Sequence, residues 1–266
     1  GAFGLGWHGV VLLAGPRLAA MARHHKVLYR DLADPVALLR GESGHTGLGQ
    51  LWPYAEGEAP SDLDTASVSD YTELMGASQQ MVAQQVLQAF DFSDYTSLLD
   101  VGGGNGSFLA YVGARYRDLE LRLFDLPGVA PLAERRLESA GLLDRVRIHG
   151  GDFHQDPLPP DQPLISLVRI LHDHDDDRVE RLLASVHRAV RPGGTLLVAE
   201  PMLGTPGAED MGAAYFGFYL LAMGSGRPRD RSELEAMLRS AGFRDMRSHR
   251  TPLPLICSVL SARKPA

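Results

Sequence analysis

One short segment constrains the fold of this chain most: the glycine-rich run Asp100-Val-Gly-Gly-Gly-Asn-Gly106. Apolar residues 97–99 precede it and residues 107–111 follow with helical character, which predicts a strand, a tight turn and a helix. Glycine permits positive φ angles and lets a ligand approach the main chain. Free N–H groups at the start of the helix would face that ligand. The segment therefore predicts a ligand-binding turn.

Residues 97–262 continue the alternation of strands and helices. Strands are expected over 97–101, 120–125, 146–150, 164–170 and 195–200, with late strands within 252–262. Helices are expected over 106–116, 129–140, 177–190, 209–224 and 231–241, with Gly141 and Gly242 ending two of them. This pattern predicts an α/β fold with a mostly parallel sheet covered on both faces, and a ligand beyond the carboxyl ends of the strands.

The first part of the chain, residues 1–95, is expected to be a mainly helical segment preceding an α/β domain over 96–266. Apolar spacing predicts helices over 18–29 and 71–90, with Ser69 and Asp70 as caps. Residues 41–60 are rich in glycine and proline and predict an irregular loop. The chain starts at Gly1 instead of Met, which suggests that its natural N-terminus is missing.

Bulk properties exclude several classes of function. The net charge is −7 and no Lys/Arg run exceeds a pair, which argues against a nucleic-acid partner. No apolar stretch reaches the roughly 18 residues of a membrane span, and no signal-peptide pattern is present. The single cysteine, Cys257, is expected to be a buried thiol in a cytoplasmic, reducing compartment.

Three features of the glycine turn favour S-adenosylmethionine (AdoMet) over a nicotinamide or flavin cofactor. Asp100 stands two residues before the first glycine, where it would order the loop or hold the methionine end. Gly102, Gly104 and Gly106 have the compact G-x-G-x-G spacing. The strings Leu123-Phe-Asp125, Gly151-Asp-Phe153 and Arg191-Pro-Gly-Gly194 follow in the order typical of Rossmann-type methyltransferases, which the chain resembles.

Acids at strand ends complete the predicted cofactor site. Asp125 would accept hydrogen bonds from the ribose hydroxyls, with a helix cap as the alternative, and Leu126 is assigned to the same site. Asp152 would accept from the adenine amino group while Phe153 covers the ring. An ordinary turn acid and a core aromatic are the equal alternative for this pair.

The reacting centre is expected after the apolar run 164–171, where the sequence continues His172-Asp-His-Asp-Asp-Asp177. Histidine is the natural base near neutral pH. Arg169 is an unusual charge within the expected strand, so contact with a cofactor carboxylate or an acid is predicted. A structural histidine and a metal site are the alternatives; the spacing matches neither zinc nor EF-hand patterns, and no metal is predicted.

The strings Ile170-Leu-His-Asp173 and Leu197-Val-Ala-Glu-Pro201 resemble the plant-type O-methyltransferases and their bacterial relatives. The resemblance implies that His172 takes the acceptor's hydroxyl proton and that Glu200 orients it. It assigns AdoMet contacts to Gly102, Asp125, Asp152, Phe153 and Arg169. It also implies a homodimer formed through an N-terminal winged-helix domain, of which only the tail would fit before residue 20.

More narrowly, Met21-Ala-Arg-His-His25, Leu51-Trp-Pro-Tyr54 and Tyr215-Phe-Gly-Phe-Tyr219 resemble the bacterial hydroxyneurosporene and demethylspheroidene O-methyltransferases. That resemblance implies a lipophilic 1-hydroxy carotenoid as acceptor, and leaves transient membrane contact open. The acceptor wall is assigned to Met75, Asp173, Tyr215, Phe218, Tyr219 and Met223. Of the pair His24 and His25, at most one is expected to reach this pocket, and both are expected to be solvated.

The chain departs from the family pattern at Gly226-Arg-Pro-Arg-Asp230, where Pro228 stands in place of a second supporting acid. This departure predicts that His172 is supported by Glu200 alone. Three alternatives for the function stay open. They are methylation of a polyketide phenol or a tetrapyrrole, an NAD-dependent oxidoreductase, and a non-methylating AdoMet protein.

Overall fold

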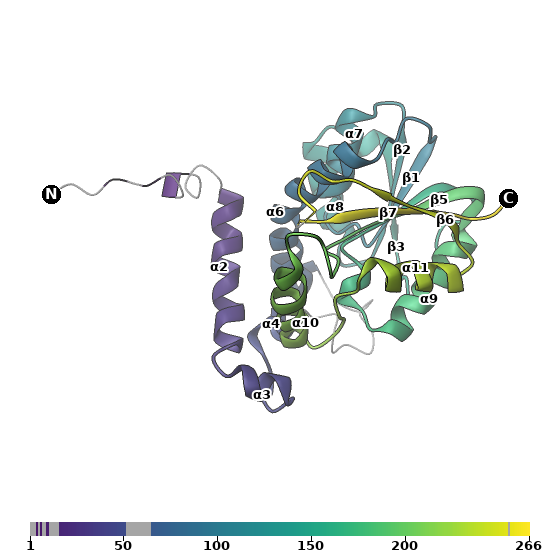
Figure 1. Ribbon diagram of the computed structural model, residues 1–266. Coiled ribbons are helices and arrows are strands. Elements are labelled where there is room, and N and C mark those ends of the chain that lie inside the picture. The colour runs from purple at the N-terminus through teal and green to yellow at the C-terminus, as the bar shows by residue number, and fades with distance from the viewer. Residues whose placement is uncertain (1–3, 5, 7–8, 11–15, 52–64, 255) are drawn as a thin grey trace.

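A seven-stranded sheet organises the chain (Figure 1), with the strand order β3-β2-β1-β4-β5-β7-β6. The computed structural model describes residues 4, 6, 9–10, 16–51, 65–254 and 256–266. The strands are β1 (Ser97–Val101), β2 (Glu120–Asp125), β3 (Val146–Gly150), β4 (Gln162–Val168), β5 (Val190–Glu200), β6 (Arg244–His249) and β7 (Ser258–Arg263). β1 to β5 pair in parallel, and β7 is antiparallel to both of its neighbours. The predicted α/β fold is confirmed.

The first three strands have the predicted bounds, but β4 and β5 differ from the prediction. β4 ends at Val168, and Arg169 follows with a φ of 58°, so the expectation that Arg169 lies inside the strand is wrong. The left-handed residue turns the chain out of the sheet. β5 begins earlier, at Val190, which pairs with Gln162 of β4; Gly193 and Gly194 also exchange backbone hydrogen bonds with Lys264.

The late strands were predicted only in part. β7 lies within the expected region, whereas β6 was missed and residues 250–257 form no strand among those described. β6 is an edge strand whose six side chains include none that is buried. Because only Met246, which is partly buried, packs against the core, the sequence of β6 lacks the apolar alternation on which the prediction relied.

Helices cover both faces of the sheet. The helical elements after β1 include α7 (Ser107–Arg115), α8 (Ala130–Ser139), η2 (Leu143–Arg145), η3 (Leu171–Asp173), α9 (Asp176–Ala189), α10 (Gly217–Met223) and α11 (Arg231–Ser240). The expected helix over 209–224 is divided, because a π-helical segment, η4 (Met211–Phe216), precedes α10. Gly141 and Gly242 follow α8 and α11 with φ angles of 67° and 105°, which confirms their predicted role.

The core lies in two layers, one on each side of the sheet. α6, α7 and α8 bury Val82, Leu109 and Leu137 on one side, and α9 and α11 bury Val186 and Leu234 on the other. Figure 1 shows these two groups of helices on either side of the strands. The buried strands are apolar on both faces, as expected of parallel strands in this position.

The N-terminal segment contains α2 (Pro16–Asp31), α3 (Pro35–Leu39), α4 (Gly47–Leu51) and α6 (Thr65–Ala89). Because α6 begins at Thr65, Ser69 and Asp70 lie inside it, and their prediction as caps is wrong. The short helix α4 occupies part of the expected irregular loop. Residues 52–54 of the string Leu51-Trp-Pro-Tyr54 lie outside the described residues. Leu28, Leu38 and Leu48 form a small core with Ala222, which joins these helices to α10.

Candidate active site

The glycine turn between β1 and α7 has the geometry that its sequence predicts. Gly102, Gly104 and Gly106 have φ angles of 71°, 57° and 73°. A Cβ at Gly102 would stand 2.4 Å from Cδ1 of Ile170, and one at Gly106 would stand 2.9 Å from Cδ1 of Leu137. A larger residue at these positions would therefore be both strained and crowded.

Two buried carboxyl groups support the turn. Asp125 Oδ2 accepts a hydrogen bond from the N–H of Gly104 at 2.7 Å, and its Oδ1 accepts one from Leu126 at 2.7 Å. Asp100 Oδ1 accepts from the Ser166 hydroxyl at 2.6 Å. Burial raises the pKa of Asp100 to about 7 and that of Asp125 to about 6. A cationic ligand beside them would favour their ionised forms.

The third strand delivers the next pair of predicted residues. Asp152 is buried and accepts from the N–H of His154 at 2.8 Å and from Gln155 Nε2 at 3.0 Å. Phe153 lies close to Gly102, since its Cε1 would be 3.6 Å from a Cβ there. The ends of β1, β2 and β3 thus bring Gly102, Asp125 and Phe153 to one edge of the sheet. Acceptor oxygens and an aromatic face beside a side-chain-free turn fit an adenosyl cofactor.

The predicted base lies in the 3₁₀ turn η3, after β4. Glu200, at the end of β5, holds this turn: its Oε1 accepts from the backbone N–H groups of Ile170 at 2.9 Å and Leu171 at 2.7 Å. Its Oε2 accepts from Nδ1 of His172 in a short contact. Both side chains are buried. Because Nδ1 is committed to Glu200, Nε2 is the nitrogen that can exchange a proton with a substrate.

A second carboxylate also contacts the imidazole. Asp173 Oδ1 lies 3.1 Å from Nε2 of His172, so the expectation that Glu200 supports the base alone is wrong. This contact was not predicted, because a second supporting acid was expected only in the 226–230 turn, whereas Asp173 directly follows His172 in the chain. Burial lowers the pKa of His172, but the two carboxylates outweigh it and raise the pKa above its usual value. Burial also raises the pKa of Asp173 to about 6.

Arg169 connects the reacting centre to the N-terminal helices. Its side chain is half-buried, and Nη1 donates to the Ser78 hydroxyl of α6 at 2.6 Å. The same helix reaches the glycine turn, since a Cβ on Gly76 would be 2.4 Å from Nδ2 of Asn105. Met75 lies in this part of α6, but its side chain is outside the described set. α6 therefore borders both the cofactor turn and the approach to His172.

The aromatic segment of η4 and α10 borders the base on its other side. The ring of Phe216, which the sequence had not singled out from its neighbours, lies 6.2 Å from that of His172. Tyr215 and Tyr219 turn towards α2, Phe218 packs against the small core around Leu28, and Met223 is buried. A π-helical segment of this kind is common at functional sites.

Two histidines of α2 meet these tyrosines. His24 Nε2 lies 2.9 Å from the Tyr219 hydroxyl, and His25 Nε2 lies 2.8 Å from that of Tyr215. His25 Nδ1 donates to the Met21 carbonyl, so its Nε2 accepts from Tyr215. The expectation of two solvated histidines is therefore wrong: α2 packs against α10, and His24 is only 6% exposed. Burial, together with His25 and Arg169, lowers the pKa of His24.

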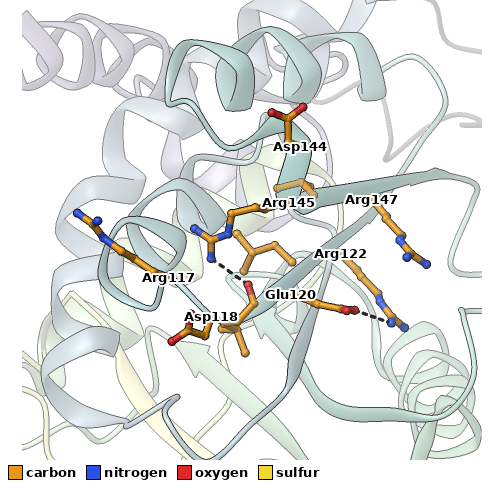
Figure 2. A pocket seen from close by; sticks show the side chains of 10 residues that line it. Arg117, Asp118, Glu120, Arg122, Asp144, Arg145 and Arg147 are labelled. Atoms are coloured by element: carbon orange, nitrogen blue, oxygen red, sulfur yellow. Dashed lines mark hydrogen bonds and ion pairs between the residues drawn. The ribbon is translucent and has the colours of Figure 1, made fainter.

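A separate pocket of about 370 Å³ lies at the amino ends of β2 and β3, opposite the carboxyl ends that carry the predicted site (Figure 2). Its lining comes from the starts of β2 and β3 and the segments before them, with side chains such as Arg117, Glu120 and Arg147. Arg145 there donates to the carbonyls of Gly113, Tyr116 and Leu119, so it supports the local fold. This pocket is remote from the carboxyl ends of the strands, where the predicted site residues meet.

Neither a metal-binding cluster nor a membrane-spanning helix is present among the described residues. Within them no group of three or more His, Cys, Asp or Glu side chains is placed to hold a metal ion. Within that same part of the chain, no helix combines the length and apolar character needed to cross a bilayer. Cys257 is buried, as predicted, and burial raises its pKa to about 12.

Comparison with known proteins decides the family. Residues 29–244 match the family model for the O-methyltransferase domain. The chain belongs to the O-methyltransferase family. It is 44% identical to the demethylspheroidene O-methyltransferase of Cereibacter sphaeroides, over the whole chain and 70% of that protein. It is 42% identical to the enzyme of the same name from Rhodobacter capsulatus, over 96% of the chain and 63% of that protein.

A solved structure supports the same O-methyltransferase assignment. Human N-acetylserotonin methyltransferase, determined in complex with SAM, superimposes with a TM-score of 0.74 at 26% identity. The match covers 94% of this chain and 70% of that one. The predicted family and fold are thus confirmed, whereas the roles assigned to individual residues remain predictions.

Proposed function

We propose that this O-methyltransferase transfers a methyl group from AdoMet to the hydroxyl of a lipophilic acceptor, a 1-hydroxy carotenoid, with His172 as general base. The observation that carries the proposal is the position of His172. It is buried, held by Glu200, and located in the turn after β4, beside the strand ends that carry the glycine turn and Asp125. The names of the two bacterial relatives support the choice of acceptor.

The cofactor-binding residues have distinct proposed roles. The glycine turn, with Asp100 beneath it, would hold the methionine end, and Asp125 would accept from the ribose. Asp152, Phe153 and Leu126 would enclose the adenine. Arg169 would bind the cofactor carboxylate in addition to its contact with Ser78. When bound, AdoMet supplies a methyl group on a positively charged sulfur, and that carbon–sulfur bond breaks with its electron pair staying on sulfur as the acceptor oxygen attacks.

His172 removes the proton that this reaction releases. The acceptor hydroxyl gives its proton to Nε2 as its oxygen bonds to the methyl carbon, so no positively charged ether accumulates. Glu200 fixes the ring with Nδ1–H directed towards it, and the charges of Glu200 and Asp173 stabilise the imidazolium that forms. A tertiary alcohol is a weak acid, so proton removal accompanies methyl transfer instead of preceding it. The rest of the protein's contribution is alignment of the two reactants.

Asp173 and the aromatic segment would receive the acceptor. Asp173 occupies Nε2 of His172 in this structure, so the entering hydroxyl takes over that contact and remains beside the carboxylate. Tyr215, Phe218, Tyr219 and Met223 would form the apolar wall, which suits a polyene chain. A homodimer is proposed on the family resemblance, and a cytoplasmic location on the single, buried cysteine. Sedimentation tests the homodimer separately.

The test is methyl transfer from labelled AdoMet to a panel of 1-hydroxy carotenoids and phenols, with His172→Gln beside the unchanged enzyme. We expect transfer to the carotenoids and a loss of about 10²- to 10⁴-fold in kcat for the variant. The rate should fall as the pH drops through the pKa of His172, with a midpoint above the ordinary value of 6.5, because only the neutral ring accepts a proton.

Other outcomes separate the alternatives. Transfer to phenols alone would retain the base and overturn the carotenoid assignment. AdoMet binding without any methyl transfer would favour a non-methylating relative. If His172→Gln retained full kcat on a methylated acceptor, the proposed base would be wrong even though the family assignment stands.

A further inference from the structure

The turn between α10 and α11 packs directly on the backbone of the turn that carries His172. Gly226 has a φ of 79°, and a Cβ there would stand 2.2 Å from the carbonyl oxygen of His172. The Ser225 hydroxyl donates to the carbonyl of Asp173 at 2.7 Å. This is the turn in which Pro228 replaces the expected second acid. In place of a carboxylate that contacts His172, this turn therefore provides groups that contact the main-chain carbonyls of residues 172 and 173.

Arg229 makes two hydrogen bonds with the same turn. Its side chain is buried, with the residue only 2% exposed. Nη1 donates to the Leu171 carbonyl at 2.6 Å, and Nη2 donates to the His174 carbonyl at 2.8 Å. Asp176 neutralises the guanidinium, at 2.6 Å from Nη2. A buried cation is rare unless it is paired and fully hydrogen-bonded, and here both conditions are met.

The two carbonyls bracket the base, and Glu200 holds the opposite end of the same turn. The carboxylate accepts from the N–H groups of Ile170 and Leu171, whereas the guanidinium donates to the carbonyls of Leu171 and His174. An anion thus faces the N–H end of the turn and a cation faces its carbonyl end, as the dipoles of the peptide groups favour. Charge-assisted hydrogen bonds at both ends fix the backbone from which His172 projects.

We propose that Arg229 is a positioning residue for His172: it fixes the carbonyl end of the catalytic turn and so keeps the imidazole in line with Glu200 and the acceptor. This rests on the proposed role of His172 as base. Lysine cannot reproduce the contact, since its single ammonium lacks the planar fork that spans two carbonyls. A small displacement of a catalytic group can cost about 10²-fold in rate.

Arg227 offers a matched control in the same turn. It pairs with Asp176 and Glu233, and its side chain is 42% exposed. Its side chain donates hydrogen bonds to Asp176, Glu233 and the carbonyl of Pro228, and none of these partners belongs to residues 170–174. Arg227→Gln therefore removes a cation from Asp176 without releasing the catalytic turn.

The experiment compares Arg229→Gln, Arg229→Lys and Arg227→Gln in the intact chain. Calorimetric titration with AdoMet counts the folded sites, and kcat is expressed per site. We expect Arg229→Gln to lose about 10²-fold in kcat and Arg229→Lys about 10-fold, with an unchanged KM for AdoMet. Arg227→Gln should keep the kcat of the unchanged enzyme. If Arg229→Gln fails to fold, Arg229→Lys, which keeps the buried charge, decides the question.

A proton NMR measurement separates this inference from the proposed base. The Nδ1–H of His172, held against Glu200, should give a far-downfield resonance that is lost in His172→Gln. It should be shifted or lost in both Arg229 variants and kept in Arg227→Gln. Equal kcat per site and an unchanged resonance in the Arg229 variants would overturn the positioning role. A His172→Gln enzyme with full activity would refute the base instead, while the resonance would still show whether Arg229 fixes the ring.

Discussion

Asp125 reaches the glycine turn across 21 residues of sequence, whereas His24 reaches Tyr219 across 195. The half of the site that we propose holds the cofactor (the cofactor half) is built from neighbouring strand–turn–helix units, and its acids stand at or just beyond the ends of their strands. The half that we propose receives the acceptor (the acceptor half) joins α2, α6 and α10, which are distant in sequence. This difference teaches that the cofactor half is set by local geometry, while the acceptor half depends on how separate segments dock.

The largest effect should come from breaking the local geometry at Gly102. Gly102→Ala places a Cβ 2.4 Å from Cδ1 of Ile170 at a φ of 71°. We expect the free energy of unfolding to fall by about 2–4 kcal/mol, from backbone strain and overpacking together, and AdoMet binding to weaken. Urea unfolding and calorimetry measure the two effects.

Two controls sharpen this prediction. Gly141 has a similar φ of 67° but open space around it, so Gly141→Ala should show only the strain, about 1–2 kcal/mol. Adding Ile170→Val to Gly102→Ala removes the clashing methyl and should recover part of the stability. Equal losses at Gly102 and Gly141 would show that crowding at the turn is unimportant.

A smaller effect should follow from the buried acid below the turn. Because burial raises the pKa of Asp100 from 3.8 to about 7, the unfolded chain releases this proton first, and stability is lost as the pH rises between those values. Asp100→Asn removes that loss. The difference in unfolding free energy between the variant and the unchanged protein should therefore increase by roughly 1–3 kcal/mol, in favour of the variant, when the pH is raised from 5 to 8.

Urea unfolding at the two pH values, without AdoMet, measures this gain. Asp144→Asn, at an exposed position, is the control and should gain nothing. Parallel pH profiles for Asp100→Asn and the unchanged protein would mean that the buried carboxyl group is ionised in both states. The variant should also bind the cationic cofactor less tightly, because it lacks the negative charge.

The smallest effect should come from the docking of α2. Tyr219→Phe removes the partner of the buried His24, and Tyr215→Phe removes that of the more exposed His25. We expect a loss of about 1 kcal/mol for Tyr219→Phe and less for Tyr215→Phe. Hydrogen exchange should show weaker protection of α2, with β1 and α7 unchanged. Equal loss of protection in both regions would contradict the distinction between the two halves.

Much of the cofactor half could be predicted because each signal is short in sequence. The glycine spacing, the strand bounds of β1 to β3 and the acids at or just beyond their ends were all found in the sequence, as was the turn with His172. Arg169 was wrongly predicted to lie inside a strand, because no local sequence pattern indicates its left-handed φ. The edge strand β6 was missed because none of its side chains is fully buried and only Met246 packs against the core.

The sequence alone determined the order of strands and helices and the group of residues at the carboxyl ends of β1 to β3. It could do so because a strand, a glycine turn and a helix that are consecutive in the chain position their own residues. Apart from Glu200, which the family resemblance assigned to His172, tertiary structure decided which groups surround the imidazole. It placed Asp173 on Nε2, Arg229 on the carbonyls beside it, and Tyr219 against His24. These contacts depend on backbone directions and on the docking of distant helices, which side-chain periodicity does not encode.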